Sequence, residues 1–185
     1  MNPLEMLKSG RTPVTVYDKN DTYNLMVQYV KAMFAESKTV AIENYDMTTW
    51  VQTKSSAKAY QSEVCSIVLP DGSHLNFKSF GCKVDISRVI SNNKGCGKAL
   101  MLIVLNAYFF ALSNLTTKVG ELILECVGSV GAGKNKRDMP VSQQTAFFRS
   151  FGFRKFGKYD PSHIHMSLQC NADSDRAIET LAKMI

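Results

Sequence analysis

A glycine-rich segment at residues 92–98 has the residue types of a phosphate-binding turn. It reads Asn-Asn-Lys-Gly-Cys-Gly-Lys and stands between residues that predict a strand and residues that predict a helix. The first turn of a helix exposes unpaired N–H groups and the positive end of the helix dipole, both of which attract phosphate. Glycine lets the backbone approach a diphosphate without a Cβ atom in the way. The pattern therefore predicts a phosphate-bearing ligand; a tight strand-to-helix connection that binds nothing is the alternative.

Glu125 is the second residue that could do chemistry, because it stands inside the apolar run 121–127. Burial of a carboxylate raises its pKa toward the range in which it acts as a general base near neutral pH. A side chain that reaches solvent at the end of the strand is the alternative. The residues leave both interpretations open.

Three further patterns could indicate a functional site, but each gives only weak support for one. Residues 128–135 nearly match a nucleotide-binding P-loop, but Asn135 stands where that motif has Ser or Thr for magnesium, so nucleotide hydrolysis is not expected. His163 and His165 share one face of a predicted strand, with no cysteine or carboxylate at metal-ligand spacing beside them, so no metal is expected. Cys96 stands at the predicted helix start, where the pKa of a thiol falls, but a small space-filling residue is the default interpretation.

The composition is that of one globular domain. The 185 residues are 45% hydrophobic and 21% charged, which is the ordinary range for a packed chain of this length. A net charge of +6 favours an anionic ligand or surface. The cysteines are odd in number and form no CxxC pair, which argues against disulfides and favours a reducing compartment. No signal peptide is evident, and the longest apolar run, residues 99–112, is too short to span a bilayer, so we expect a cytoplasmic protein.

Periodicity predicts the elements that position these residues. A helix is expected over residues 25–34 with Asp21 as its N-cap, and a second over residues 46–59 with Trp50 toward the core. Asp-Gly at residues 70–73 predicts a hairpin turn, and Gly152 is expected to end a helix. Strands are expected at residues 14–17, 63–69, 75–80, 83–88, 121–127 (buried on both faces), 154–159 and 164–169, and further helices at residues 98–113, 141–151 and 173–184. Early hairpins followed by strands that alternate with helices predict a mixed α/β fold.

The segment 84–100 resembles the acetyl-CoA signature of the GNAT N-acetyltransferase superfamily, in which Gln or Arg is followed after two residues by Gly, any residue, and Gly or Ala. Gly95 and Gly97 match, while Asn92 stands in place of Gln or Arg. Residues 122–127, 147–159 and 165–168 are similar to the fifth strand, to the closing helix with its Gly-Phe turn and sixth strand, and to the seventh strand of that family.

The resemblance implies the GNAT-like fold, a mixed and splayed central sheet with helices on both faces. The chain would be one domain over residues 1–185. Residues 11–80 would form the N-terminal half and acceptor side, residues 82–169 the CoA-binding core, and residues 173–184 an extra C-terminal helix.

The resemblance also implies roles for particular residues. The backbone of Asp85, Ile86 and Ser87 would pair with the pantetheine arm, and Glu125 would be the general base. Phe148 stands near the CoA sulfur where many members have a tyrosine acid, so Tyr159 is the candidate acid. The pyrophosphate loop would consist of Asn92, Asn93, Lys94, Gly95, Cys96, Gly97, Lys98 and Ala99.

The function implied is direct transfer of an acetyl or other acyl group from acetyl-CoA to an amine on a small molecule or a protein. The acceptor pocket would be built by residues 23–60 and 128–140. A catalytically degenerate GNAT-like binding module is one alternative, favoured by Asn92 and Phe148. A GNAT-fold enzyme acting on nucleic acid is another, supported only by the net charge and the basic loop. We expect a monomer or homodimer that uses no metal and no membrane.

Overall fold

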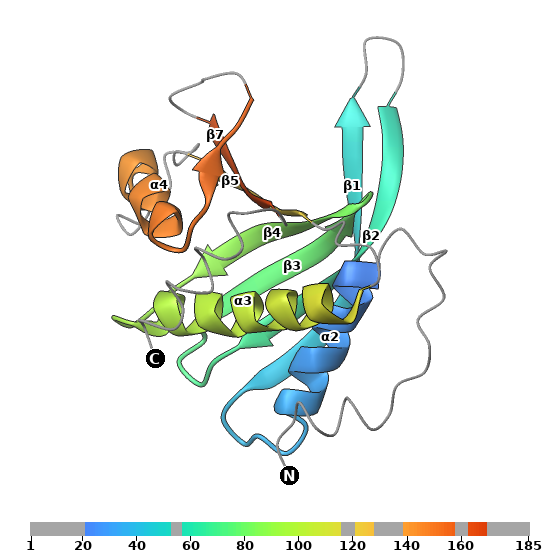
Figure 1. Ribbon diagram of the computed structural model, residues 1–185, viewed down its shortest axis with the longest axis vertical. Coiled ribbons are helices and arrows are strands. Elements are labelled where there is room, and N and C mark those ends of the chain that lie inside the picture. The colour runs from blue at the N-terminus through green and yellow to red at the C-terminus, as the bar shows by residue number, and fades with distance from the viewer. Residues whose placement is uncertain (1–20, 53–56, 116–120, 128–138, 158–162, 170–185) are drawn as a thin grey trace. The chain divides into compact units, whose positions relative to one another are not determined.

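The computed structural model describes residues 21–52, 57–115, 121–127, 139–157 and 163–169 (Figure 1). The chain divides into two compact units, residues 1–120 and residues 121–185, and each is described by itself. The expected strand at 14–17, most of the loop 128–140, Tyr159 and the expected helix 173–184 lie outside the described residues.

The first unit is an antiparallel sheet with two helices on one side. Its sheet has the order β1-β2-β3-β4, and α2 and α3 contact each other on the same side of it (Figure 1). The elements in chain order are α2 (Asp21–Met33), β1 (Ala41–Gln52), β2 (Ala57–Val68), β3 (His74–Phe80), β4 (Lys83–Ile90) and α3 (Cys96–Asn114).

Apolar periodicity explains both helices. In α2, Met26 and Val30 lie one turn apart and are fully buried, and Tyr29 packs against Phe110 of α3 with ring centroids 5.1 Å apart. The predicted helix is confirmed, although Asp21 lies in its first turn instead of preceding it. Helix α3 is apolar on nearly all sides, and it packs against both α2 and the sheet.

Helix α3 also has the length and composition of a membrane span. An 18-residue stretch of this 19-residue helix has a mean hydropathy of 1.6, and 56% of that stretch is buried within the structure, as in the core helix of a globular protein. The apolar run at residues 99–112 was too short to cross a bilayer, but the helix extends beyond it. The length of the helix alone therefore does not exclude a membrane span.

The helix predicted over residues 46–59 is wrong. This stretch belongs to a long hairpin in which β1 pairs with β2 from Ala41 opposite Val68 to Gln52 opposite Ala57. Thr48, Thr49 and Val51 are β-branched and favour extended backbone. Pairing with β2 satisfies the N–H and C=O groups that a helix would have satisfied internally.

The remaining strands of the first unit confirm the predicted hairpins. Leu69 N–H donates to Ser73 O at 2.8 Å, which closes the predicted turn at residues 70–73. Strand β4 carries a bulge, because Asn76 pairs with Arg88 and Phe77 with Ile86, so that Ser87 has no opposite residue. A bulge bends its strand and increases the local twist.

The second unit is an antiparallel sheet of order β5-β7-β6 with one helix. Its elements are β5 (Glu121–Val127), α4 (Val141–Ser150), β6 (Arg154–Lys155) and β7 (His163–Gln169). Leu122, Leu124 and Cys126 are buried, whereas Glu125 is exposed, so β5 is buried on one face and the predicted burial on both faces is wrong. Strand β6 is shorter than the predicted strand 154–159.

Helix α4 ends as predicted at Gly152, which has φ 93°. Gly152 N–H donates to Arg149 O at 3.0 Å and Phe153 N–H to Phe148 O at 3.3 Å. The rings of Phe148 and Phe153 lie 6.1 Å apart. This double hydrogen bond with its apolar contact is the Schellman motif, which requires a left-handed residue at the position of Gly152. The element order in both units confirms the predicted α/β class and follows the order that the GNAT resemblance implied.

Candidate functional site

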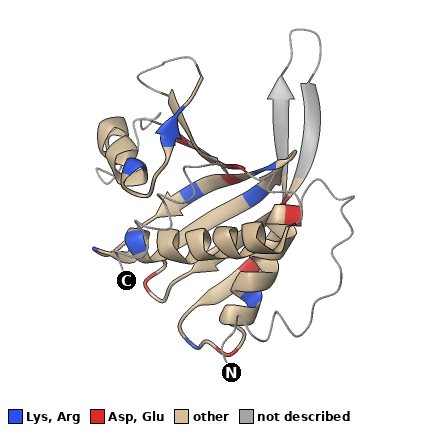
Figure 2. Ribbon diagram, in the orientation of Figure 1, with Lys and Arg blue, Asp and Glu red and all other residues tan. Residues whose placement is uncertain are grey.

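The loop between β4 and α3 ends at a helix N-terminus whose first turn is only partly capped. Gly95 is the N-cap residue, with φ 91° and ψ −21°, and it makes no side-chain capping bond. The first turn of α3 carries no acidic residue. Lys94 and Lys98 are exposed, and Figure 2 shows basic residues at this end of α3 and none along the rest of the helix. The end of the helix therefore combines its own partial positive charge with two cations.

Part of the loop's backbone is already hydrogen-bonded. Cys96 N–H donates to Asn93 O at 3.2 Å, Gly97 N–H to the Ser91 hydroxyl at 3.0 Å, and Ala99 N–H to Gly95 O at 3.0 Å. Within the described residues, the N–H groups of Lys94, Gly95 and Lys98 have no partner. Of the donors that the sequence assigned to a pyrophosphate, these three are open to a ligand.

The turn at residues 70–73 holds this loop in place by hydrogen bonds. Asn92 donates its side-chain N–H to Asp71 O at 2.8 Å and its backbone N–H to the Ser73 hydroxyl at 2.8 Å. Asn93 Nδ2 donates to Asp71 Oδ2 at 2.8 Å, and the Cys96 thiol lies 3.3 Å from the same oxygen. Asn92 and Asn93 therefore use their amides to fix the loop on the turn.

Asp71 is the centre of this network and was missed by sequence reasoning. The pKa of Asp71 is held below its usual value, mainly by the hydrogen bond from Ser73 N–H. Desolvation raises this pKa, and the hydrogen bonds from the Ser73 hydroxyl, Cys96 and Asn93 lower it further. The Asp-Gly pair identified a turn, but no pattern in the sequence connected that turn with a loop about twenty residues later.

The three β4 residues assigned to the pantetheine arm lie on the strand that leads into this loop. Asp85 pairs with Lys78 across the strands at 3.7 Å, and Ile86 is buried. Ser87 stands at the bulge, and its hydroxyl lies 3.4 Å from Asn76 O.

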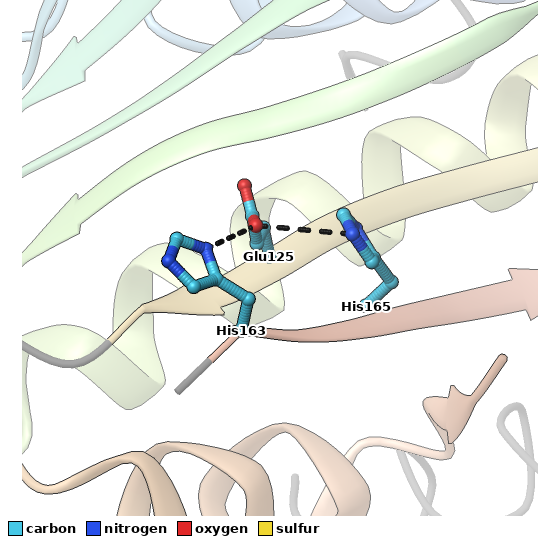
Figure 3. Close-up of polar contacts among 3 residues, drawn as sticks. All are labelled: Glu125, His163 and His165. Atoms are coloured by element: carbon cyan, nitrogen blue, oxygen red, sulfur yellow. Dashed lines mark hydrogen bonds and ion pairs between the residues drawn. The ribbon is translucent and has the colours of Figure 1, made fainter. Parts of the chain in front are cut away.

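In the second unit, Glu125 lies between two histidines. Its Oε1 atom is 2.8 Å from Nδ1 of His163 and 3.8 Å from Nε2 of His165 (Figure 3). The three side chains are 41%, 43% and 48% exposed for Glu125, His163 and His165 respectively. Of the two interpretations left open for Glu125, the structure therefore supports the side chain that reaches solvent.

A carboxylate stands beside the two histidines in space, although none lies at metal-ligand spacing along the chain. Antiparallel pairing of β5 and β7 sets Glu125 opposite His165, with His163 two residues away on the same face. Spacing within one strand does not show this, because the partner comes from another strand. In the part of the chain that the structure describes, no group of three or more His, Cys, Asp or Glu is arranged to hold a metal.

Phe148, at the position where the resemblance expects an acid near the CoA sulfur, is a core residue of the second unit. Its side chain is 8% exposed and packs edge to face against Phe147 and Phe153. A phenyl ring has no proton to donate.

No family model and no curated protein matches the sequence. Solved structures that are similar to the chain include two acetyltransferases. Nourseothricin acetyltransferase is 16% identical, over 72% of this chain and 99% of that one, with a TM-score of 0.38. An acetyltransferase from Bacillus cereus ATCC 14579 is 10% identical, over 85% of this chain and 93% of that one, with a TM-score of 0.32.

Proposed function

We propose that the protein transfers an acetyl group directly from acetyl-CoA to an amine. The observation that carries the proposal is a set of three N–H groups at the start of a 19-residue helix, on Lys94, Gly95 and Lys98, that have no partner among the described residues. Charge-assisted hydrogen bonds from backbone N–H groups and a helix N-terminus suit a diphosphate.

The hydrogen bonds of the loop support a division of roles within it. Lys94, Gly95 and Lys98 hold the pyrophosphate by their N–H groups, and the two ammonium groups add charge. Asn92 holds the loop in its conformation, because its backbone N–H and its side-chain N–H both donate to the turn at residues 70–73. The backbone of residues 85–87 on β4 holds the pantetheine arm.

The chemistry requires one proton to leave the amine and one to reach the sulfur. As the amine nitrogen attacks the thioester carbonyl, a C–N bond forms and the C–S bond breaks. Glu125 and its histidine partner provide a proton acceptor. Phe148 cannot protonate the departing thiolate, so Tyr159 or water does so. The acceptor is an amine on a small molecule or protein, and the protein acts in the cytoplasm as a monomer or homodimer.

Calorimetric titration with CoA and acetyl-CoA tests the loop. We expect saturable binding that weakens as salt is added, because the phosphates meet Lys94 and Lys98. The matched comparison is Lys98→Gln against Lys38→Gln, since both lysines are exposed but Lys38 lies outside the loop. Absence of CoA binding at millimolar ligand would remove the proposal.

Turnover is tested separately by mass spectrometry of a panel of amines incubated with acetyl-CoA. A new acetylated amine is the expected result. Binding without any product would instead support a CoA-binding module without transfer, which is favoured by one specific observation, the buried phenyl ring of Phe148 in place of an acid.

A further inference from the structure

The Glu125–His163–His165 cluster is asymmetric. One carboxylate oxygen faces two imidazole rings, but only His163 is within hydrogen-bond distance, at 2.8 Å against 3.8 Å for His165 (Figure 3). The His165 ring also lies against Phe156, with ring centroids 5.7 Å apart. The two histidines therefore differ in what they can do, although both are partly exposed on the same face of β7.

The hydrogen bond fixes the protonation of the His163 ring. A carboxylate accepts and does not donate, so Nδ1 of His163 must carry the hydrogen. In a neutral imidazole the other nitrogen, Nε2, then has the free lone pair. Within the described residues Nε2 of His163 has no hydrogen-bond partner. The ring is thus oriented with an open proton-accepting atom and a carboxylate behind it.

An imidazole is a better proton acceptor near neutral pH than an exposed carboxylate. The reference pKa values are about 6.5 for histidine and about 4.3 for glutamate, and a base works best when its pKa lies near the working pH. Glu125 is 41% exposed, and its Oε1 is already engaged by His163. Its geometry suits a group that orients and stabilises an imidazolium ion.

We infer that His163 is the general base of the transfer reaction and that Glu125 is its positioning residue. The inference rests on the proposed acetyl transfer and changes the role of Glu125 within it. The amine nitrogen attacks the thioester carbonyl and forms the C–N bond while the C–S bond breaks. The amine proton passes to Nε2 of His163, Glu125 stays ionised beside the imidazolium, and the thiolate takes its proton from solvent.

The experiment compares three single variants, His163→Gln, Glu125→Gln and His165→Gln. The last is the matched control, because it makes the same substitution two residues away on the same face of the same strand. We expect His163→Gln to lower kcat by about 100- to 10,000-fold with CoA affinity unchanged. Glu125→Gln should lose less, and His165→Gln should keep the activity.

The pH profile of kcat/KM separates the two possible bases. The acid limb that reports the essential base should disappear in His163→Gln and persist in Glu125→Gln. If Glu125 is the base, Glu125→Gln loses at least as much activity as His163→Gln, and His163→Gln keeps its acid limb. That result overturns the inference and leaves acetyl transfer intact.

Nitrogen NMR of the histidine rings provides a readout that does not depend on turnover. We expect His163 in the Nδ1–H form, changing toward a mixture of forms in Glu125→Gln, while His165 is unaffected. An Nε2–H form of His163 in the intact protein overturns the inference. If the wild-type protein binds CoA but transfers nothing to any amine, the proposed function fails and the inference fails with it.

Discussion

Replacing Gly95 with alanine tests whether the backbone at the start of α3 shapes the ligand site. Gly95 has φ 91° and ψ −21°, a conformation that side chains with a Cβ rarely adopt. A Cβ placed there would meet no atom within 4 Å, so the cost is backbone strain alone. Left-handed backbone costs a non-glycine residue about 1–2 kcal/mol. For a chain of this length that cost lowers Tm by about 2–8 °C.

The same substitution should weaken CoA binding by more than its effect on stability suggests. If the cap relaxes toward negative φ, the N–H of Gly95 turns away from the phosphate. A hydrogen bond to a charged group contributes about 1.5–3 kcal/mol, which corresponds to about 10- to 100-fold in Kd. Thermal melting and calorimetric titration measure the two effects on the same protein sample.

Two controls make the reasoning refutable. Gly95→Asn should lose less stability than Gly95→Ala, because asparagine tolerates positive φ better than alanine. Gly81→Ala should lower Tm without changing CoA affinity, since Gly81 has φ 59°, has no atom within 4 Å of a built Cβ, and lies in the β3–β4 turn. An unchanged Tm in Gly95→Ala, or equal loss of CoA affinity in Gly81→Ala, contradicts the argument.

Three further predictions concern stability and reactivity. Tyr23→Phe should raise the free energy of unfolding in urea by about 1 kcal/mol, because the buried Tyr23 hydroxyl has no partner among the described residues. Tyr29→Phe is the control. A lower free energy of unfolding in Tyr23→Phe would show that the hydroxyl has a partner. Asp71→Asn should destabilise at neutral pH: the folded state lowers the pKa of Asp71, so its contribution is present above the unfolded value of about 3.9 and is lost as pH falls through the folded value. The difference from wild type should therefore vanish in acid, and a constant difference at all pH values would refute it. Burial raises the pKa of the Cys65 thiol to about 12, so an alkylating reagent should label the exposed Cys82 and leave Cys65 unmodified until the protein unfolds. Peptide mass spectrometry measures the two labelling rates, and equal rates would refute this prediction.

The sequence predicted the features whose causes are local. The glycine-rich loop, the helix after it and the helix end at Gly152 each depend on residues within a few positions of one another. Glycine at a left-handed position and apolar residues at helical spacing are both visible in a short window.

Features that depend on pairing between distant segments could not be predicted. The stretch 46–59 was interpreted as a helix, yet its partner strand decided its conformation. The contact of Glu125 with His163 joins residues 38 positions apart and follows from the β5–β7 register, which no spacing within a strand reveals. The same limit hid Asp71, whose partners at residues 92–96 lie beyond two further strands.

The support of the loop by the turn at residues 70–73 limits which sequence changes the protein accepts. Exposed hairpin turns ordinarily tolerate insertions and drift freely in composition. This turn cannot, because Asp71 and Ser73 hold Asn92 and Asn93 by three hydrogen bonds of 2.8 Å each, and the Ser73 hydroxyl is itself bonded to Asp71. One inserted residue would shift these acceptors and release the loop. A library that varies surface turns should therefore leave residues 70–73 intact, as it would a residue that touches substrate.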